Sequence, residues 1–131
     1  MQVEILALCD AANDYQGRLC MLGAFDIIQA RTFPATHPHC AIALRLRFTL
    51  IENGQHAVRL HFVNDDGQLI LPPLEAQLEI ACSEQIGSAS TNLILGVQSL
   101  PLEKPGDYAI NLAVDGRQVA SIPLFVRSAA A

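Results

Sequence analysis

The sequence predicts an all-β fold: a single antiparallel β-sandwich of about seven to nine strands over residues 1–127. Apolar and polar side chains alternate in several short runs, which is the period of strands with one buried face. Turn residues recur about every ten positions, and no run carries a long helical stripe. The clearest run is residues 102–126, which reads as a corner followed by a hairpin that turns at Asp115 and Gly116, a pair suited to positive φ angles.

In the first half of the chain, residues 3–9 are predicted to be a strand that the polar segment 10–17 breaks. Residues 18–30 read as two short strands that meet at a central glycine, because glycine within a strand often marks a bend. Residues 31–40 hold two prolines and are predicted to be a loop between sheets. Residues 41–50 alternate most regularly of all and are predicted to be a strand.

In the second half, the segment 76–82 fits both a helical stripe and a strand. We interpret it as a strand because it is short and its flanking segments are all β. The other expected elements are a strand through 58–62, a turn at 64–67, a short extended piece at 68–71, a loop at 83–90, a strand at 91–97, a corner at 99–106 and a flexible tail at 128–131.

The corner before the final hairpin has a recognisable pattern. Leu102 lies six residues ahead of Tyr108, with Pro105 and Gly106 between them. This spacing resembles the tyrosine corner of fibronectin type III and other immunoglobulin-like sandwiches. The resemblance implies an immunoglobulin-like sandwich in which the Tyr108 hydroxyl bonds back to the backbone of the crossing loop.

Several short motifs together resemble an uncharacterised bacterial family, a domain of unknown function. They lie at the opening, in the middle and at the close of the chain, at residues 3–4, 8–12, 17–19, 22–24, 64–67, 105–108, 114–116 and 122–126. Most of these positions are turn or core positions. The resemblance therefore implies the fold and lends no activity and no functional residues.

Composition argues against several classes of partner. Thirteen Asp and Glu against eight Lys and Arg give a net charge of −5, the wrong sign for nucleic-acid binding. No run has the length of a transmembrane helix, so no membrane partner is expected. The first residues carry no signal-peptide pattern, which predicts a cytoplasmic protein whose four cysteines are reduced.

One cluster suggests metal chemistry. His37, His39 and Cys40 could supply three ligands to a zinc ion, with a fourth from Cys9, Cys20 or His56. Only one half of a typical paired zinc pattern is present. The alternative is a loop with two solvated histidines and a cysteine that enters the core, in which case the protein needs no cofactor.

A second cluster suggests a binding surface. If the strands 41–50 and 58–62 are neighbours, Arg45, Arg47, Arg59 and His61 form a cationic patch on one sheet face. Such a patch would suit an acidic partner or a second subunit. The alternative is an ordinary solvated face on which these side chains pair with a carboxylate such as Glu79.

The sequence lacks a nucleophile elbow, a phosphate loop and a dinucleotide fingerprint, which favours a non-catalytic protein. We therefore expect a β-sandwich that binds a protein partner or forms a homo-oligomer. Two alternatives stay open: a metal- or small-ligand-binding module at residues 37–40, and a hydrolase of unrecognised type in which Cys40 or convergent carboxylates act.

Overall fold

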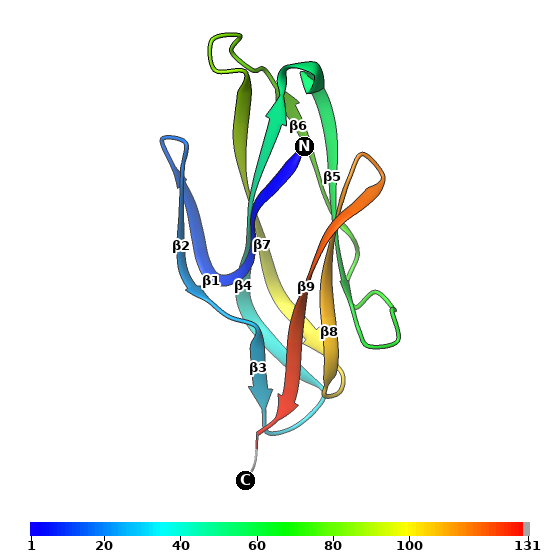
Figure 1. Ribbon diagram of the computed structural model, residues 1–131. Helices are drawn as coiled ribbons and strands as arrows, with labels where there is room; N and C mark the ends of the chain where they lie inside the picture. Colours follow the sequence, from blue (N-terminus) through cyan, green and yellow to red (C-terminus); the bar gives the residue numbers. More distant parts are fainter. Residues whose placement is uncertain (130–131) are drawn as a thin grey trace.

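Residues 1–129, which a computed structural model describes, form nine β-strands and one short 3-10 turn (Figure 1). The elements are β1 (Gln2–Tyr15), β2 (Arg18–Ala24), β3 (Ile27–Ala30), β4 (Ala35–Thr49), η1 (Leu50–Glu52), β5 (Gly54–Val63), β6 (Leu74–Ile80), β7 (Ser88–Leu102), β8 (Gly106–Val114) and β9 (Arg117–Ser128). No helix within these residues has the length and apolar character to cross a membrane.

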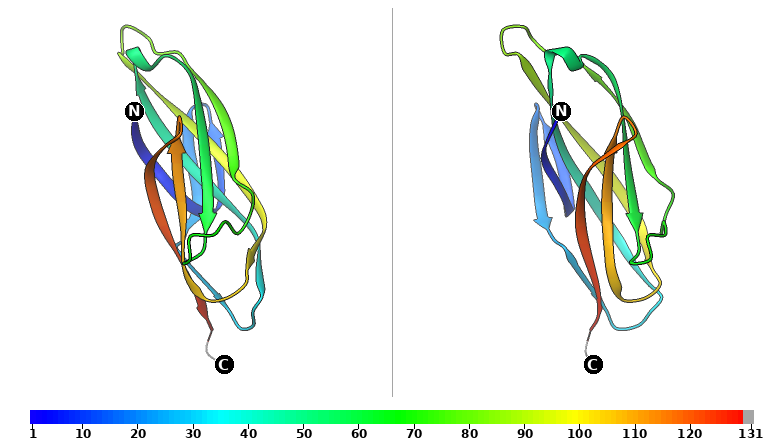
Figure 2. Two further views of the ribbon diagram at one scale, coloured as in Figure 1. Left: turned by 90° about the vertical axis from the view of Figure 1, so that its right-hand side faces the viewer. Right: turned by 45° about the vertical axis from the view of Figure 1, so that its right-hand side comes forward.

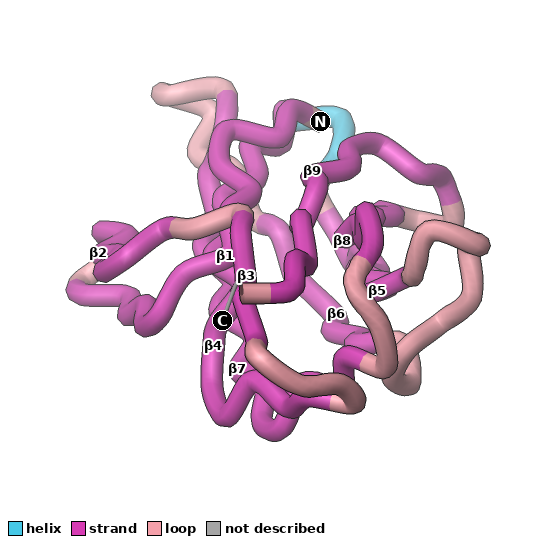
Figure 3. The backbone as a smooth tube through the Cα atoms, turned by 90° about the horizontal axis from the view of Figure 1, so that it is seen from below, coloured by secondary structure: helices cyan, strands magenta, loops and turns pink. Residues whose placement is uncertain are grey.

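The strands form two sheets that pack face to face. One has the order β2-β1-β4-β7 and the other β3-β9-β8-β5-β6. Neighbours pair antiparallel except β3 and β9, which are parallel. Figure 3 places β1, β4 and β7 on one side of the molecule and β9, β8 and β5 on the other, and Figure 2 gives two further views of these layers. The predicted all-β sandwich is confirmed.

The core lies between the two sheets and comes from alternate residues of the central strands. On β4 these are Cys40, Ile42, Leu44, Leu46 and Phe48, and their partners across the core are Val58, Leu60 and Phe62 of β5 and Tyr108, Ile110, Leu112 and Val114 of β8. All are buried, and burial of each large aliphatic or aromatic side chain contributes roughly 1.5–3 kcal/mol. The alternation of aliphatic with other residues along each strand therefore determines which face of the strand is buried.

The corner at Tyr108 has the expected geometry. The Tyr108 ring is buried, and its hydroxyl donates to the carbonyl oxygen of Lys104 at 2.7 Å. Leu102 is buried in the same core. The hairpin that follows turns at Asp115 and Gly116, with φ angles of 53° and 80°. These contacts connect β7 of one sheet to β8 of the other.

Strand β1 is longer than the sequence predicted. It does not break at Asp10 but continues to Tyr15, because its pairing partner changes from β4 to β2. The change occurs at Cys9, which is opposite both Ala41 of β4 and Ala24 of β2. Its second half forms a hairpin with β2 whose turn is Gln16-Gly17. The polar residues that looked like a breaker lie on an exposed hairpin, where alternation with apolar residues is not required.

This β1–β2 hairpin folds over the outer face of the four-stranded sheet. Asn92 of β7 donates to the Asp14 carboxylate at 3.2 Å and to the Gly17 carbonyl oxygen at 3.1 Å. Beneath the hairpin lies a small second cluster of buried residues, Cys9, Ala41 and Ala43, with Ala12, Leu19 and Ile94 packed against it. The small side chains on β4 let the hairpin come close.

The predicted loop at 31–40 is mostly strand. Strand β4 starts at Ala35 and pairs with β7 on both sides of Pro38. Proline is tolerated there because β1 pairs with β4 only as far as Ala41, so the first residues of β4 form an edge. The loop proper is confined to residues 31–34.

Other boundaries also shift. The segment predicted at 76–82 is a strand, as interpreted, but it runs from Leu74 to Ile80. Residues 68–71 make only an isolated bridge from Leu69 to Val63. Strand β7 covers both the end of the expected loop 83–90 and the start of the expected corner 99–106. Ser128 belongs to β9 and Ala129 donates its backbone N–H to Ala30, so only residues 130–131 of the expected tail lie outside the described residues.

Candidate functional site

The proposed metal ligands do not converge. Cys40 points into the core and is fully buried. His39 accepts a hydrogen bond from the side-chain amide of Gln98 at 2.7 Å, and the His37 ring lies 5.5 Å from the ring centre of Phe25. Across residues 1–129 no group of three or more His, Cys, Asp or Glu side chains is placed to hold a metal ion. Cys40 enters the core, as the alternative interpretation expected, but His37 and His39 stand on strand β4 and not on a loop.

The two buried thiols, Cys9 and Cys40, are poor nucleophiles. Burial is the main cause that raises the pKa of Cys40 to about 11, and the nearby negative charges of Cys9 and Asp10 contribute less. Burial also raises the pKa of Cys9, whose Sγ lies on the opposite face of the sheet and donates to the Ala41 carbonyl oxygen. Cys9, Cys20, Cys40 and Cys82 are all free thiols, and only Cys20 is exposed.

The predicted cationic patch is not formed, because β4 and β5 belong to different sheets. Arg45 and Arg47 lie on the outer face of β4, where both donate to Glu4, at 3.0 and 2.7 Å. Hydrogen bonding to Arg47 is the main cause that lowers the pKa of Glu4.

The other half of that patch lies on the five-stranded sheet. Arg59 is opposite Glu75 of β6 and forms an ion pair with it, so its carboxylate partner is Glu75 and not the Glu79 given as an example. His61 is opposite Asn111 of β8. The turn at η1 carries the chain from one sheet to the other, so strands adjacent in the sequence are not neighbours in space.

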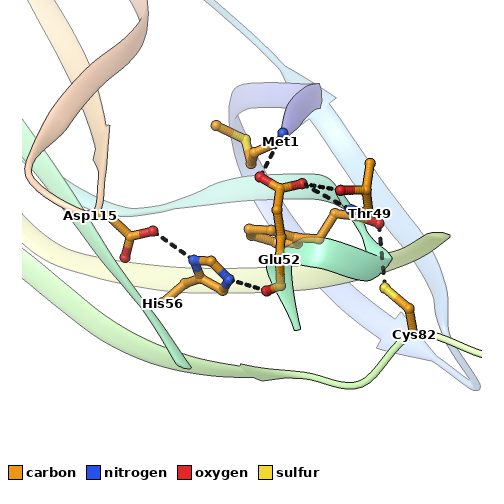
Figure 4. A network of polar contacts seen from close by, with 7 residues as sticks. Met1, Thr49, Glu52, His56, Cys82 and Asp115 are labelled. Carbon is orange, nitrogen blue, oxygen red and sulfur yellow. Dashed lines mark hydrogen bonds and ion pairs between the residues drawn. The ribbon is translucent and has the colours of Figure 1, made fainter. Parts of the chain in front are cut away.

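A polar network joins the η1 turn to the β8–β9 hairpin (Figure 4). His56 Nδ1 lies 2.6 Å from Asp115 Oδ2, and His56 Nε2 lies 2.5 Å from the Glu52 carbonyl oxygen. Both partners accept hydrogen bonds, so this geometry favours the form of the ring that carries a proton on both nitrogens. The bonds to Glu52 and Asp115 accordingly raise the pKa of His56.

Glu52 ties further groups into the same network. Its carboxylate accepts hydrogen bonds from the Thr49 backbone N–H at 2.9 Å and the Thr49 hydroxyl at 3.0 Å, and pairs with the Met1 ammonium group at 2.8 Å. These interactions lower the pKa of Glu52 to about 2, and the hydrogen bond from the Met1 ammonium group has the largest effect. Cys82 Sγ donates to the nearby Phe48 carbonyl oxygen.

The network is built to hold structure. The His56 ring packs on Phe48 with 4.6 Å between ring centres, and neither ring nitrogen is free to take a proton from a substrate. The sequence pattern places Asp115 only in a turn and His56 only among the optional ligands of a metal site. No local signal pairs two residues so far apart in the chain.

The strand edges differ in how they are protected from pairing with other chains. Strand β6 carries Glu75 and Glu79, β3 has four residues, and β2 has seven residues that begin at Arg18. Strand β7 has fifteen residues without a single charged side chain. Charges and short length are the usual protections of an edge.

Strand β7 is also regular along most of its length. It pairs with β4 from Ser88 to Gln98 without a register shift, and among the described residues β4 is its only neighbour in the sheet. Only at its far end do Ser99, with φ of 54°, and Pro101 disturb it. The segment Ser88 to Gln98, here called the β7 edge, is the candidate functional site.

Comparisons with known proteins agree with the fold and leave the activity open. Residues 4–127 match the Family of unknown function (DUF6941). No curated protein matches the chain. Among solved structures, the chain is similar to the alkylpurine DNA glycosylase AlkC of Pseudomonas fluorescens, bound to DNA containing an abasic site analog, with a TM-score of 0.54 and 10% identity. The match covers 96% of this chain and 30% of that one, and at this identity it shows the fold alone.

Proposed function

The chain belongs to this family of unknown function, and we propose that it is a non-catalytic, immunoglobulin-like β-sandwich of the bacterial cytoplasm that binds another polypeptide by strand pairing at the β7 edge. The observation on which this proposal rests is the length of the uncharged, regular β7 edge. The tyrosine corner at Tyr108 supports the immunoglobulin-like assignment, and the four free thiols suit a reducing compartment.

The backbone of the β7 edge supplies the binding energy in this proposal. An edge strand leaves alternate N–H and C=O groups without a partner in its own sheet, and an extended chain that adds to the edge satisfies them. From Ser88 to Gln98 no proline and no charged side chain stands in the way. The other three edges lack this combination of length and neutrality.

Side chains of β7 give the added strand something to pack on. Ala89, Leu93 and Leu95 are half-buried at the border of the core, with one side still open. A neighbouring strand with apolar residues at alternate positions would complete their burial. On the outer face, Asn92 accepts a hydrogen bond from Arg45 at 2.8 Å and donates one to Asp14 of the β1–β2 hairpin at 3.2 Å.

A nucleic-acid role is less well supported. The net charge is −5, and Arg45, Arg47, Arg59 and Arg127 all pair with carboxylates of this chain. Contacts to phosphate groups require an excess of free cations. The likeness to a DNA glycosylase concerns the fold, so it adds no weight to DNA binding.

Gly96 allows a clean test. A Cβ atom added there would have no heavy atom within 4 Å, and the backbone φ is ordinary, so Gly96→Lys places a charge within the β7 edge, near its C-terminal end, without strain. Gln77→Lys, on the exposed side of β6, is the matched control with the same added charge on another edge.

The measurement is affinity capture from the source cell with the wild-type protein and the two variants as baits. We expect the polypeptides held by the wild type to be retained by Gln77→Lys and lost by Gly96→Lys. Retention of the same polypeptides by all three baits would refute strand pairing at this edge.

A further inference from the structure

We propose that the polypeptide that occupies the β7 edge is the β7 strand of a second copy of this chain. Two copies would pair antiparallel about a two-fold axis and join their four-stranded sheets into one of eight strands. This inference rests on the proposed function and names the partner that the edge selects. Three features of the edge lead to it.

The first feature is charge. In a two-fold pair each residue near the axis meets its own counterpart, so any charged side chain there would face a like charge. Strand β7 has no charged residue from Ser88 to Leu102. The absence of charge near the axis therefore suits a partner that is a second copy of the same strand.

The second feature is the way the strand ends. Pairing between two copies can extend only where both are regular, and this stretch runs from Ser88 to Gln98. Ser99, with a positive φ, and Pro101 stop it at one end, and the turn at residues 84–86 with Gly87, whose φ is 82°, stops it at the other. About eleven residues at roughly 3.4 Å each give a contact of some 35 Å, which is longer than the usual strand.

The third feature is the match of side chains. Because Leu93 and Leu95 stand on the inner face near the middle of the edge, the two-fold places them beside the same residues of the partner. The cores of both copies would then continue across the junction. Gly96 and Ser90 on the outer face are small, so the two backbones meet no obstacle there.

The size of the contact sets the affinity we expect. A single strand pair buries an area at or below the low end of specific interfaces, about 1,200 Å². We therefore expect a reversible dimer with a Kd in roughly the micromolar range, not a permanent one. The dimer should appear only when the protein is concentrated.

Analytical ultracentrifugation of the purified full chain, at concentrations from about 1 to 500 µM, brackets that Kd. We expect the wild type and Gln77→Lys to pass from monomer to dimer, and Gly96→Lys to stay monomeric or to dimerise at least about tenfold more weakly. Equal thermal unfolding of the three proteins, followed by circular dichroism, ensures that folded chains are compared.

Two outcomes would overturn the self-pairing. One is a dimer that Gly96→Lys leaves intact, which would place the contact on another surface. The other is a wild type that is monomeric throughout. In that second case, loss of captured polypeptides by Gly96→Lys would still support strand pairing with a different protein, so the failure of this inference can be told apart from the failure of the proposed function.

Discussion

His56 and Asp115 lie 59 positions apart in the chain, yet Nδ1 of His56 on β5 lies 2.6 Å from Oδ2 of Asp115 in the turn of the β8–β9 hairpin. Asp115 Oδ1 accepts a second bond from the backbone N–H of Ala57 at 2.9 Å, and these two bonds lower the pKa of Asp115. The hairpin turn is thus fixed by charge as well as by backbone pairing.

This contact predicts a dependence of stability on pH. The pKa of His56 is raised above its ordinary value of 6.5, so its contribution to the free energy of unfolding is complete below about pH 6.5 and is lost as pH rises through the folded-state value. His56→Gln should cost about 1–2 kcal/mol at pH 6 and less at pH 8.5. Urea unfolding of both proteins across this range measures the difference, and parallel pH curves would contradict the assignment of an imidazolium.

Tyr108→Phe removes only the hydroxyl that bonds to Lys104. Because that carbonyl then loses its partner at the corner, we expect the free energy of unfolding to fall by about 1 kcal/mol with the fold unchanged. Tyr15→Phe, on the exposed β1–β2 hairpin, is the control and should have no measurable effect. Equal effects of the two changes would show that the corner contributes nothing beyond ring burial.

The cysteines should differ sharply in reactivity. Cys20 is exposed, whereas Cys9 and Cys40 are fully buried and burial raises both of their pKa values, that of Cys40 to about 11. A thiol reagent at pH 8 should therefore label Cys20 fast and the buried pair only on unfolding. Mass spectrometry of the labelled protein checks this, with Cys20→Ser as control, and rapid labelling of Cys40 in the folded protein would revive a nucleophilic role.

Gly23→Ala should be destabilising by roughly 1–3 kcal/mol. Gly23 has a φ of 66°, and the Asp10 carboxylate lies against the position that a Cβ atom would take. Gly96→Ala is the matched change at a site with open space and an ordinary φ, and should be close to neutral. Thermal unfolding of both variants measures these effects. A neutral Gly23→Ala would mean that the β2–β3 bend adjusts easily.

What the sequence could predict was local. The alternation in β4 and β8, the hairpin at Asp115-Gly116 and the corner at Tyr108 depend on residues within about ten positions of one another, so their patterns are legible. Alternation also shows which side chains are buried together, although it does not show in which sheet a strand lies.

What it could not predict was the choice of partners. Arg47 and Arg59 follow the same alternation, yet they lie in different sheets because η1 carries the chain across the core. The change of partner at Cys9, the contact of His56 with Asp115 and the isolation of the β7 edge likewise follow from tertiary pairing. That pairing separates the two halves of the cationic patch, whereas alternation along β4 turns Cys40 into the core and away from His39. The candidate site is a strand edge with no sequence motif.

The hairpin that folds over the outer face of the four-stranded sheet has one more consequence. Ala41 and Ala43 of β4 lie between the core on one side and the hairpin on the other, so the protein has three layers at this point instead of two. Amide protons in this part of β4 should exchange with deuterated solvent only when the whole molecule opens. Their exchange rates would therefore report the global free energy of unfolding.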